Sequence, residues 1–311
     1  MKIKNIYLLL LLASFWGPSF LFIKIAVEEI PPVMLAALRI GTGALVLNLI
    51  LLFSKYRLPR DFSLWKKIFI AGFFAQGLPF ILMNWGEQYV DSSLASVLNG
   101  LVPIFTILLA HNMVADERLN PQKVRGVLLG FLGLIILILP SLFDGVQGSL
   151  GGIIGITIAA LSYSIGFVYI RKHLINLPAF TAPAAQLLSV SVYLVPISFI
   201  VYPNFDLTAI GSSALISTLI LGVIGTAIAF VVYFKLIEQS SAGYASLVTY
   251  IMPVFGVVLG VAFLDEPLTP WILLGAAFIL LGIKVTKQRK AAAKLPKVKF
   301  KIDPALYTKF R

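Results

Sequence analysis

The chain has 311 residues, 59% hydrophobic and 12% charged, with a formal net charge of +12, and its 24 glycines bring the apolar share to about two thirds, against about 45–50% in an average soluble domain. These values exclude a soluble globular protein, because a chain of about 300 residues still leaves about a quarter of its unfolded surface facing water. No cysteine and only two histidines are present, which excludes a disulfide framework and a Cys- or His-rich metal site, so no cofactor is expected.

Apolar runs of about 20 residues follow one another along the chain, and each is long enough to cross a hydrocarbon layer of about 30 Å as a helix. They lack the alternation of apolar and polar positions that a closed barrel needs. The first run is too long for the core of a signal peptide and has no small-x-small cleavage site. We therefore predict an all-α polytopic membrane protein with ten transmembrane helices, at residues 5–26, 32–53, 67–87, 92–113, 121–140, 149–171, 181–202, 211–237, 241–264 and 269–286.

Basic residues gather in alternate connections between these spans. One side, with both termini, carries 23 of the 25 Lys and Arg residues, whereas the connections on the other side carry mainly Asp and Glu. By the positive-inside rule, both termini are expected in the cytoplasm of a bacterium, with the spans in its cytoplasmic (inner) membrane. The basic tail at 289–311 is expected to attract anionic membrane lipids, and no nucleic-acid partner is expected.

The sequence repeats itself after about 150 residues. A first block recurs at an offset of 150, matching Ala95-Ser96-Val97-Leu98 and Pro103 with Ala245-Ser246-Leu247-Val248 and Pro253. A second block recurs at an offset of 149, matching Glu117, Leu119, Pro121, Gly126 and Gly133 with Glu266, Leu268, Pro270, Gly275 and Gly282. Because five helices per repeat is an odd number, the copies are expected to be inverted in the membrane, an arrangement typical of transporters. The predicted units are a first five-helix repeat at 1–145, a second at 146–288, and the tail.

Several motifs stand out along the two repeats. They are Ser14-Phe15-Trp16-Gly17-Pro18-Ser19-Phe20, Arg39, Pro103 followed by Glu117-Arg118-Leu119, and Pro253 followed by Asp265-Glu266-Pro267-Leu268. With the repeat spacing, the chain resembles the EamA-type members of the drug/metabolite transporter superfamily over about residues 5–287. The resemblance implies ten helices, a central cavity between the halves, and export of amino acids or related metabolites.

Polar and aromatic residues deep in the spans are candidates for a water-filled path, because polar groups that face lipid are costly. We expect a substrate cavity lined by Trp16, Gln76, Asn84, Asn99, Tyr163, Thr249 and Tyr250. The aromatic members would hold an apolar or cationic moiety by stacking or cation–π contact, and ordinary core packing is the alternative. Trp85, Tyr89 and Trp271 lie near span ends and are expected in the interfacial belt.

Helix-breaking residues inside the spans are candidates for hinges or kinks: Gly17, Pro18, Pro79, Pro103 and Pro253. A proline removes one backbone donor and clashes with the preceding turn, which bends a helix or frees carbonyls to line a cavity. Because Pro103 and Pro253 are repeat mates, their kinks are expected to be symmetric. The alternative is that these residues only shape packing.

Three charged residues stand out. Arg39 lies about seven residues into its span, where a charge costs about 2.5–3.5 kcal/mol. We expect it either to be a structural clamp, paired with Glu28, Glu29 or carbonyls, or to meet a substrate carboxylate. Glu117 and Glu266 end repeat-mate spans and are expected to act at helix boundaries or gates.

The expected function is secondary export of amino acids or similar small metabolites by alternating access between the inverted repeats. The chain has no nucleotide-binding loop, and its acidic residues fall at span ends, with His111 as a lone relay candidate. Export is therefore expected to be facilitative or weakly coupled.

The alternative functions within transport are a sugar-phosphate, nucleotide-sugar or drug carrier, a channel, or a lipid scramblase. An enzyme is not expected, because the sequence shows no cluster of acid, base or metal-binding groups. The partners expected are a small-molecule substrate and membrane lipids. A homodimer through the fifth and tenth spans is a further hypothesis.

Overall fold

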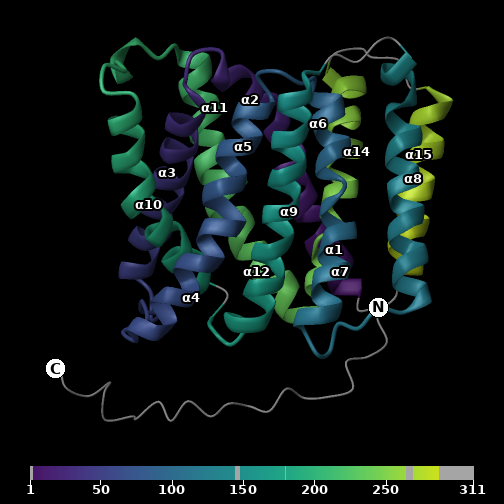
Figure 1. The fold of residues 1–311 in the computed structure, drawn as a ribbon, viewed down its shortest axis with the longest axis horizontal. Coiled ribbons are helices and arrows are strands. Elements are labelled where there is room, and N and C mark those ends of the chain that lie inside the picture. Colours follow the sequence, from purple (N-terminus) through teal and green to yellow (C-terminus); the bar gives the residue numbers. More distant parts are fainter. Residues whose placement is uncertain (1–2, 144–147, 179, 264–268, 287–311) are drawn as a thin grey trace.

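Apolar runs separated by short polar turns build a bundle of helices (Figure 1). The computed structural model describes residues 3–143, 148–178, 180–263 and 269–286. Within these ranges the regular structure is helical, and one isolated β-bridge joins Val90 and Gly148.

Seven helical segments of the described residues are long and apolar enough to cross a membrane, and two shorter apolar helices span Ala242–Phe255 and Pro270–Val285. The seven are Asn5–Val27, Pro32–Leu52, Phe62–Gly86, Leu94–Met113, Leu150–His173, Thr181–Val201 and Ser212–Gln239. The protein is therefore an α-helical, multi-pass membrane protein.

The first half of the chain forms nine helical elements. They are α1 (Ile3–Trp16), α2 (Ser19–Val27), α3 (Pro32–Leu52), α4 (Phe62–Gly72), the π-helix η1 (Phe73–Gly77), α5 (Leu78–Gly86), α6 (Ser92–Asn99), α7 (Val102–Met113) and α8 (Pro121–Phe143). Prolines stand in the first turn of α3 and α7, where the missing N–H costs no hydrogen bond, whereas Pro79 of α5 lies inside the continuous span Phe62–Gly86.

The second half follows with a similar series. It comprises α9 (Leu150–His173), α10 (Thr181–Val201), the short 3₁₀ helix η2 (Leu207–Ala209), α11 (Ser212–Gly222), the π-helix η3 (Val223–Ile228), α12 (Ala229–Gln239), α13 (Ala242–Ala245), α14 (Val248–Phe263) and α15 (Pro270–Val285). Side-chain caps begin several helices, with Asp61, Ser149, Ser241 and Thr269 accepting from backbone N–H groups of the first turn.

The helices run alternately between the two ends of the bundle. The connections α2–α3, α5–α6 and α10–α11 lie at the end opposite the N-terminus, and α7–α8, α9–α10 and α12–α13 lie at the N-terminal end (Figure 1). Glu266 and the tail at 289–311 fall outside the described residues.

The two π-helices occupy equivalent positions, because η1 begins at Phe73 and η3 at Val223, which is the 150-residue offset of the sequence repeat. The helices before them also pack alike. A Cβ atom at Gly72 would stand 3.3 Å from the carbonyl oxygen of Gln186 on α10, and one at Gly222 would stand 3.1 Å from that of Arg39 on α3. A π-helix inside a span is often a functional feature.

Helices α8 and α15 approach each other through glycines. A Cβ atom at Gly126 would lie 2.7 Å from the carbonyl oxygen of Gly282, and one at Gly133 would lie 2.7 Å from that of Gly275. These gaps admit no side chain, so the glycines allow the two backbones to touch.

The apolar side chains divide between the core and the outer surface. The largest buried side chains include Tyr233, Tyr250 and Phe230, in the middle of the bundle. Large apolar side chains also cover the outside, where Phe53 is 91% exposed and Ile200 is 76% exposed. An apolar surface of this kind is what lipid tails would cover.

Candidate functional site

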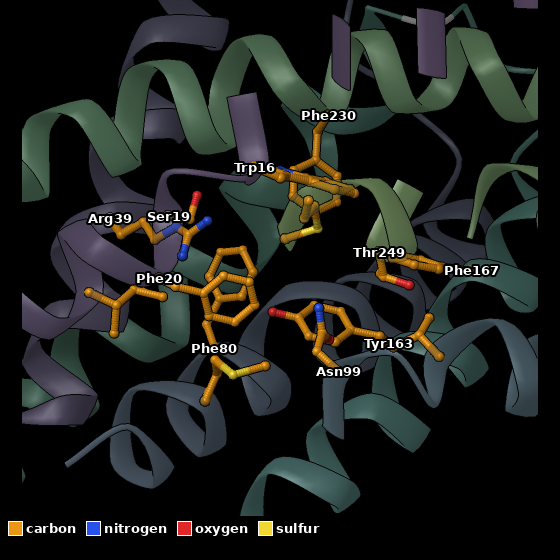
Figure 2. A pocket seen from close by; sticks show the side chains of 14 residues that line it. Trp16, Ser19, Phe20, Arg39, Phe80, Asn99, Tyr163, Phe167, Phe230 and Thr249 are labelled. Carbon is orange, nitrogen blue, oxygen red and sulfur yellow. The ribbon is translucent and has the colours of Figure 1, made fainter. Parts of the chain in front are cut away.

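A cavity lies in the middle of the bundle, where elements from both halves of the chain meet (Figure 2). Its volume is about 50 Å³, which is room for a few water molecules. It is lined by Trp16, Ser19, Phe20, Ile23, Arg39, Phe80, Met83, Asn99, Val102, Tyr163, Phe167, Phe230, Thr249 and Met252.

Six of the fourteen residues that line the cavity are aromatic. The Trp16 ring lies 5.6 Å from that of Phe230, between centroids, in an edge-to-face arrangement. On the opposite side, the Tyr163 ring lies 6.2 Å from Phe80 and 5.8 Å from Phe167. Such pairs are stable at these distances, so the wall can hold an apolar group without rearranging its own contacts.

Arg39 is the one charged residue of this lining. Its Nε donates to Thr226 Oγ1 at 2.8 Å and its Nη2 donates to the Gly225 carbonyl at 3.3 Å, while its Cζ stands 4.0 Å from the Phe80 ring centroid. These bonds use two of the five guanidinium donors, so the group keeps donors for a ligand. In Figure 2 the guanidinium and the Tyr163 hydroxyl both point toward the middle of the cavity.

The π-helix η3 explains why both Trp16 and Arg39 are held there. The Gly225 carbonyl accepts from Trp16 Nε1 at 2.9 Å as well as from Arg39. The widened turn of a π-helix changes the backbone pairing, which makes such carbonyls available to side chains. At the equivalent π-helix η1, the Phe74 carbonyl accepts from Ser162 Oγ on α9 at 2.9 Å.

The structure brings four of the seven expected cavity residues together: Trp16, Asn99, Tyr163 and Thr249 line the cavity. The Asn99 Oδ1 atom is buried and has no hydrogen-bond partner among the described residues. This acceptor is therefore free for a donor inside the cavity.

The other three expected residues are buried outside the lining. Asn84 Nδ2 donates to the Pro32 carbonyl at 3.1 Å, and Tyr250 Oη donates to the Val127 carbonyl at 3.1 Å. Gln76 sits in η1, and neither of its amide atoms has a partner among the described residues, which is also true of Gln186 on α10.

The expected hinge residues lie mostly at helix junctions. Gly17 and Pro18 separate α1 from α2, Pro79 follows η1 at the start of α5, and Pro103 opens α7 after a break at 100–101. Pro253 differs, because it lies inside the continuous helix α14. The kinks expected at the two repeat-mate prolines therefore take different forms.

Glu117 binds the two halves of the chain together at the N-terminal end of the bundle. Its carboxylate accepts from the backbone N–H groups of Ala242 at 2.8 Å and Gly243 at 3.1 Å, and it lies 3.3 Å from Arg171 Nε. Arg171 also contacts Asp116 at 2.7 Å. Burial raises the pKa of the Glu117 carboxyl, against the opposing hydrogen bonds from Gly243 and Ala242 and the Arg171 charge.

His111 has a structural contact at the same end. Its Nδ1 accepts from the backbone N–H of Leu119 at 3.2 Å, which ties the end of α7 to the following connection. The interfacial aromatic residues expected from the sequence are partly exposed, with Trp271 46% and Tyr89 51% exposed.

Sequence reasoning missed most of the apolar lining. Phe80, Phe167 and Phe230 supply rings, and Met83 and Met252 close the gaps between them. With 23 phenylalanines in the chain, these residue types carried no signal that separates cavity wall from core or lipid-facing surface.

Comparisons with known proteins give the family. A model of the EamA-like transporter family matches residues 3–139 and again residues 150–286. The chain is 30% identical to the uncharacterized transporter YoaV of Bacillus subtilis (strain 168), over 86% of this chain and 91% of that protein. It is 28% identical to an uncharacterized transporter of Archaeoglobus fulgidus, over 92% of this chain and all of that protein.

A further relative carries a more specific name. The chain is 27% identical to the probable amino-acid metabolite efflux pump of Escherichia coli (strain K12), over 92% of this chain and 95% of that protein. One solved crystal structure shares the fold, with a TM-score of 0.72 at 18% identity, over 92% of this chain and 98% of the other. The helical bundle and its central cavity fit a transporter, as these matches do. The chain belongs to the EamA-like transporter family.

Proposed function

We propose that the protein exports amino acids or similar small metabolites by alternating access through the central cavity. The observation that carries the proposal is a single cationic group, Arg39, set among aromatic walls. A substrate carboxylate would accept from the guanidinium, while the apolar part of the substrate would pack on the rings. The Escherichia coli relative named as a probable amino-acid metabolite efflux pump supports this substrate class.

Polar side chains of the lining have roles in this proposal. Asn99 Oδ1 would accept from a substrate ammonium or amide group, because it is a buried acceptor without a partner among the described residues. Tyr163 and Thr249 would supply hydroxyl groups. Trp16 would act as the aromatic wall and, through η3, as a link to Arg39.

The cavity must change shape during transport. The substrate has to enter from one side of the membrane and leave on the other, so the lining helices have to separate during the cycle. We place the hinges at the π-helices η1 and η3 and at the Gly17-Pro18 junction, where the regular helical hydrogen bonding is interrupted. On the gate hypothesis, Glu117 and Arg171 hold the N-terminal end closed in this state.

Packing between the two halves supports the inverted five-helix repeats. In the sequence repeat, Gly126 and Gly133 of α8 correspond to Gly275 and Gly282 of α15. In the structure the contacts are exchanged: Gly126 contacts Gly282, and Gly133 contacts Gly275. Contacts exchanged in this way are those of a pseudo-two-fold axis. With such an axis, ten spans and cytoplasmic termini form one consistent arrangement. In this arrangement export would be facilitative, down the gradient of the substrate, or weakly coupled.

A ligand screen tests the substrate class. Purified full-length protein would be heated with the twenty standard amino acids, sugar phosphates, nucleotides or cationic drugs. We expect amino acids to raise the melting temperature of the wild type and of the exposed control Arg60→Gln, but not of Arg39→Gln. Stabilisation by phosphorylated ligands alone would point to a sugar-phosphate or nucleotide-sugar carrier instead.

A further inference from the structure

Glu87 is a buried acid that the proposed transport path does not use. It follows α5 directly, and its exposed fraction is 0%. Neither of its carboxylate oxygens has a hydrogen-bond partner among the described residues. Burying an ionised carboxylate without hydrogen bonds is strongly unfavourable, so these surroundings fit the neutral acid.

The charged and titratable groups that face Glu87 from the packed helices are Lys24 of α2, Arg39 of α3 and Tyr163 of α9. Lys24 Nζ donates to the backbone carbonyl of Glu87 at 2.8 Å, not to its carboxylate. The bonds of the Arg39 guanidinium go to η3. Within the described residues, neither cation forms an ion pair with the Glu87 carboxylate.

A second polar side chain nearby, Asn84 of α5, has an acceptor atom that receives no hydrogen bond from the described residues. Asn84 is three residues before Glu87, so the two side chains share one face of α5. Its Nδ2 is bonded to the Pro32 carbonyl, but its Oδ1 is buried and has no partner among the described residues. An amide oxygen and a carboxylate are both acceptors, and a proton on the carboxyl supplies the donor that both lack.

This pair is close to the cavity lining along the chain, although neither residue belongs to the lining. Met83, beside Asn84 in the chain, lines the cavity, and so does Ile23, beside Lys24. The charges of Arg39 and Glu87 act on each other. A ligand charge at Arg39 would therefore change how readily Glu87 ionises.

We propose that Glu87 is a proton-binding site of the transport cycle, with Asn84 as its hydrogen-bond acceptor, and that the proton travels with an anionic substrate group. The proposal rests on the proposed function. Because a substrate carboxylate at Arg39 repels a Glu87 carboxylate, Glu87 holds its proton more tightly in the loaded cavity than in the empty one. Glu87 takes the proton from water on the loading side and returns it to water on the release side, so only its O–H bond forms and breaks.

Infrared spectroscopy tests proton binding without any substrate. The protonated-carboxyl band of the purified full-length protein would be followed from about pH 5 to about pH 9. We expect a band at neutral pH in the wild type, in Glu87→Asp, and in Glu28→Gln, whose carboxylate is exposed at the end of α2. The band should be weaker in Glu87→Gln by the contribution of one carboxyl group. Its absence in the wild type, or a band of unchanged strength in Glu87→Gln, would overturn the proposal.

Transport tests the coupling and its sign. Proteoliposomes would be loaded with a mixture of the twenty labelled standard amino acids and a pH-sensitive dye, then diluted. We expect outflow of label to make the lumen more alkaline in the wild type and in Glu28→Gln, and the ratio of protons to label to fall near zero in Glu87→Gln. A lumen that turns acidic or keeps its pH would overturn the coupling. If no label leaves the wild type, the proposed function fails, and the infrared result alone decides proton binding.

Discussion

Arg39 is bonded to η3 on one side and open to the cavity on the other. The two roles weighed for it from the sequence, clamp and substrate contact, are thus compatible in one side chain. Its partners are Thr226 and Gly225, and Glu28 and Glu29 do not take part: Glu29 accepts from the Gly211 N–H at 2.6 Å. On the proposed function, the bidentate geometry of the guanidinium would be the main determinant of substrate affinity.

We expect Arg39→Gln to lower the transport efficiency for an anionic substrate by about ten- to a hundred-fold, since hydrogen bonds to charged groups contribute about 1.5–3 kcal/mol. Arg39→Lys should recover only part of this loss, because an ammonium lacks the planar fork. The exposed Arg60→Gln is the control. Initial rates of amino-acid uptake into proteoliposomes measure the effect, and equal rates in all three variants would remove Arg39 from the site.

The Trp16 side chain contributes an aromatic ring and a hydrogen-bond donor, and a substitution can remove the donor while keeping a ring. Trp16→Phe keeps an aromatic wall but leaves the buried Gly225 carbonyl with fewer donors, which costs about 1–3 kcal/mol. We expect a lower melting temperature and slower transport, whereas Trp271→Phe, at a position 46% exposed, should change neither. A Trp16→Phe protein that melts and transports like wild type would show that the bond to η3 is dispensable.

At the scale of elements, glycine contacts decide which helices can touch. Gly133→Ala places a Cβ atom 2.7 Å from backbone atoms of α15, so we expect a loss of about 1–3 kcal/mol from forced separation. Gly41→Ala is the matched control on α3, where the nearest atom is a Val195 methyl at an ordinary 3.5 Å. It should be neutral or slightly stabilising. Thermal unfolding in detergent compares the two, and equal melting temperatures would contradict close α8–α15 packing.

The contact between Glu117 and the start of α13 gives a second prediction for an element. Glu117→Ala removes the acceptor of two backbone N–H groups and one partner of Arg171, all buried. We expect destabilisation of about 3–5 kcal/mol, the cost of breaking a buried ion pair. The exposed Glu238→Ala, at the same end of the bundle, should have little effect. Similar unfolding of both variants would argue against a gate contact at Glu117.

Helical spans and their breaks could be predicted from particular residues, and their local hydrogen bonding could not. Pro18 and Pro103 marked real junctions, because a proline cannot continue the backbone ladder. The π-helices were not foreseen, since Phe73–Gly77 has no residue that forces a wider turn. Gln76 and Asn84 were expected in the cavity because they are polar and lie deep in a span. Depth along a span does not determine whether a side chain faces the cavity or a neighbouring helix.

At the scale of the whole molecule, the repeat in sequence reappears in the bundle as matched packing. Both π-helices sit 150 residues apart, and the glycines of α8 and α15 meet in exchanged pairs. Most Lys and Arg residues lie in the connections on one side of the spans, and this distribution is the basis of the orientation that we propose for the chain in the membrane. The apolar composition that excluded a soluble protein is spread over both the core and the exposed outer surface.

On the proposed function, the cavity between the two halves carries substrate by alternating access. Counterflow in proteoliposomes tests it most directly. Vesicles containing the full-length protein would be loaded with unlabelled amino acids, and entry of the same labelled amino acids would be followed. We expect transient accumulation of label above its outside concentration, with a rate that saturates. A flux that grows linearly with concentration and shows no acceleration by the inside amino acids would contradict it and indicate a channel or scramblase.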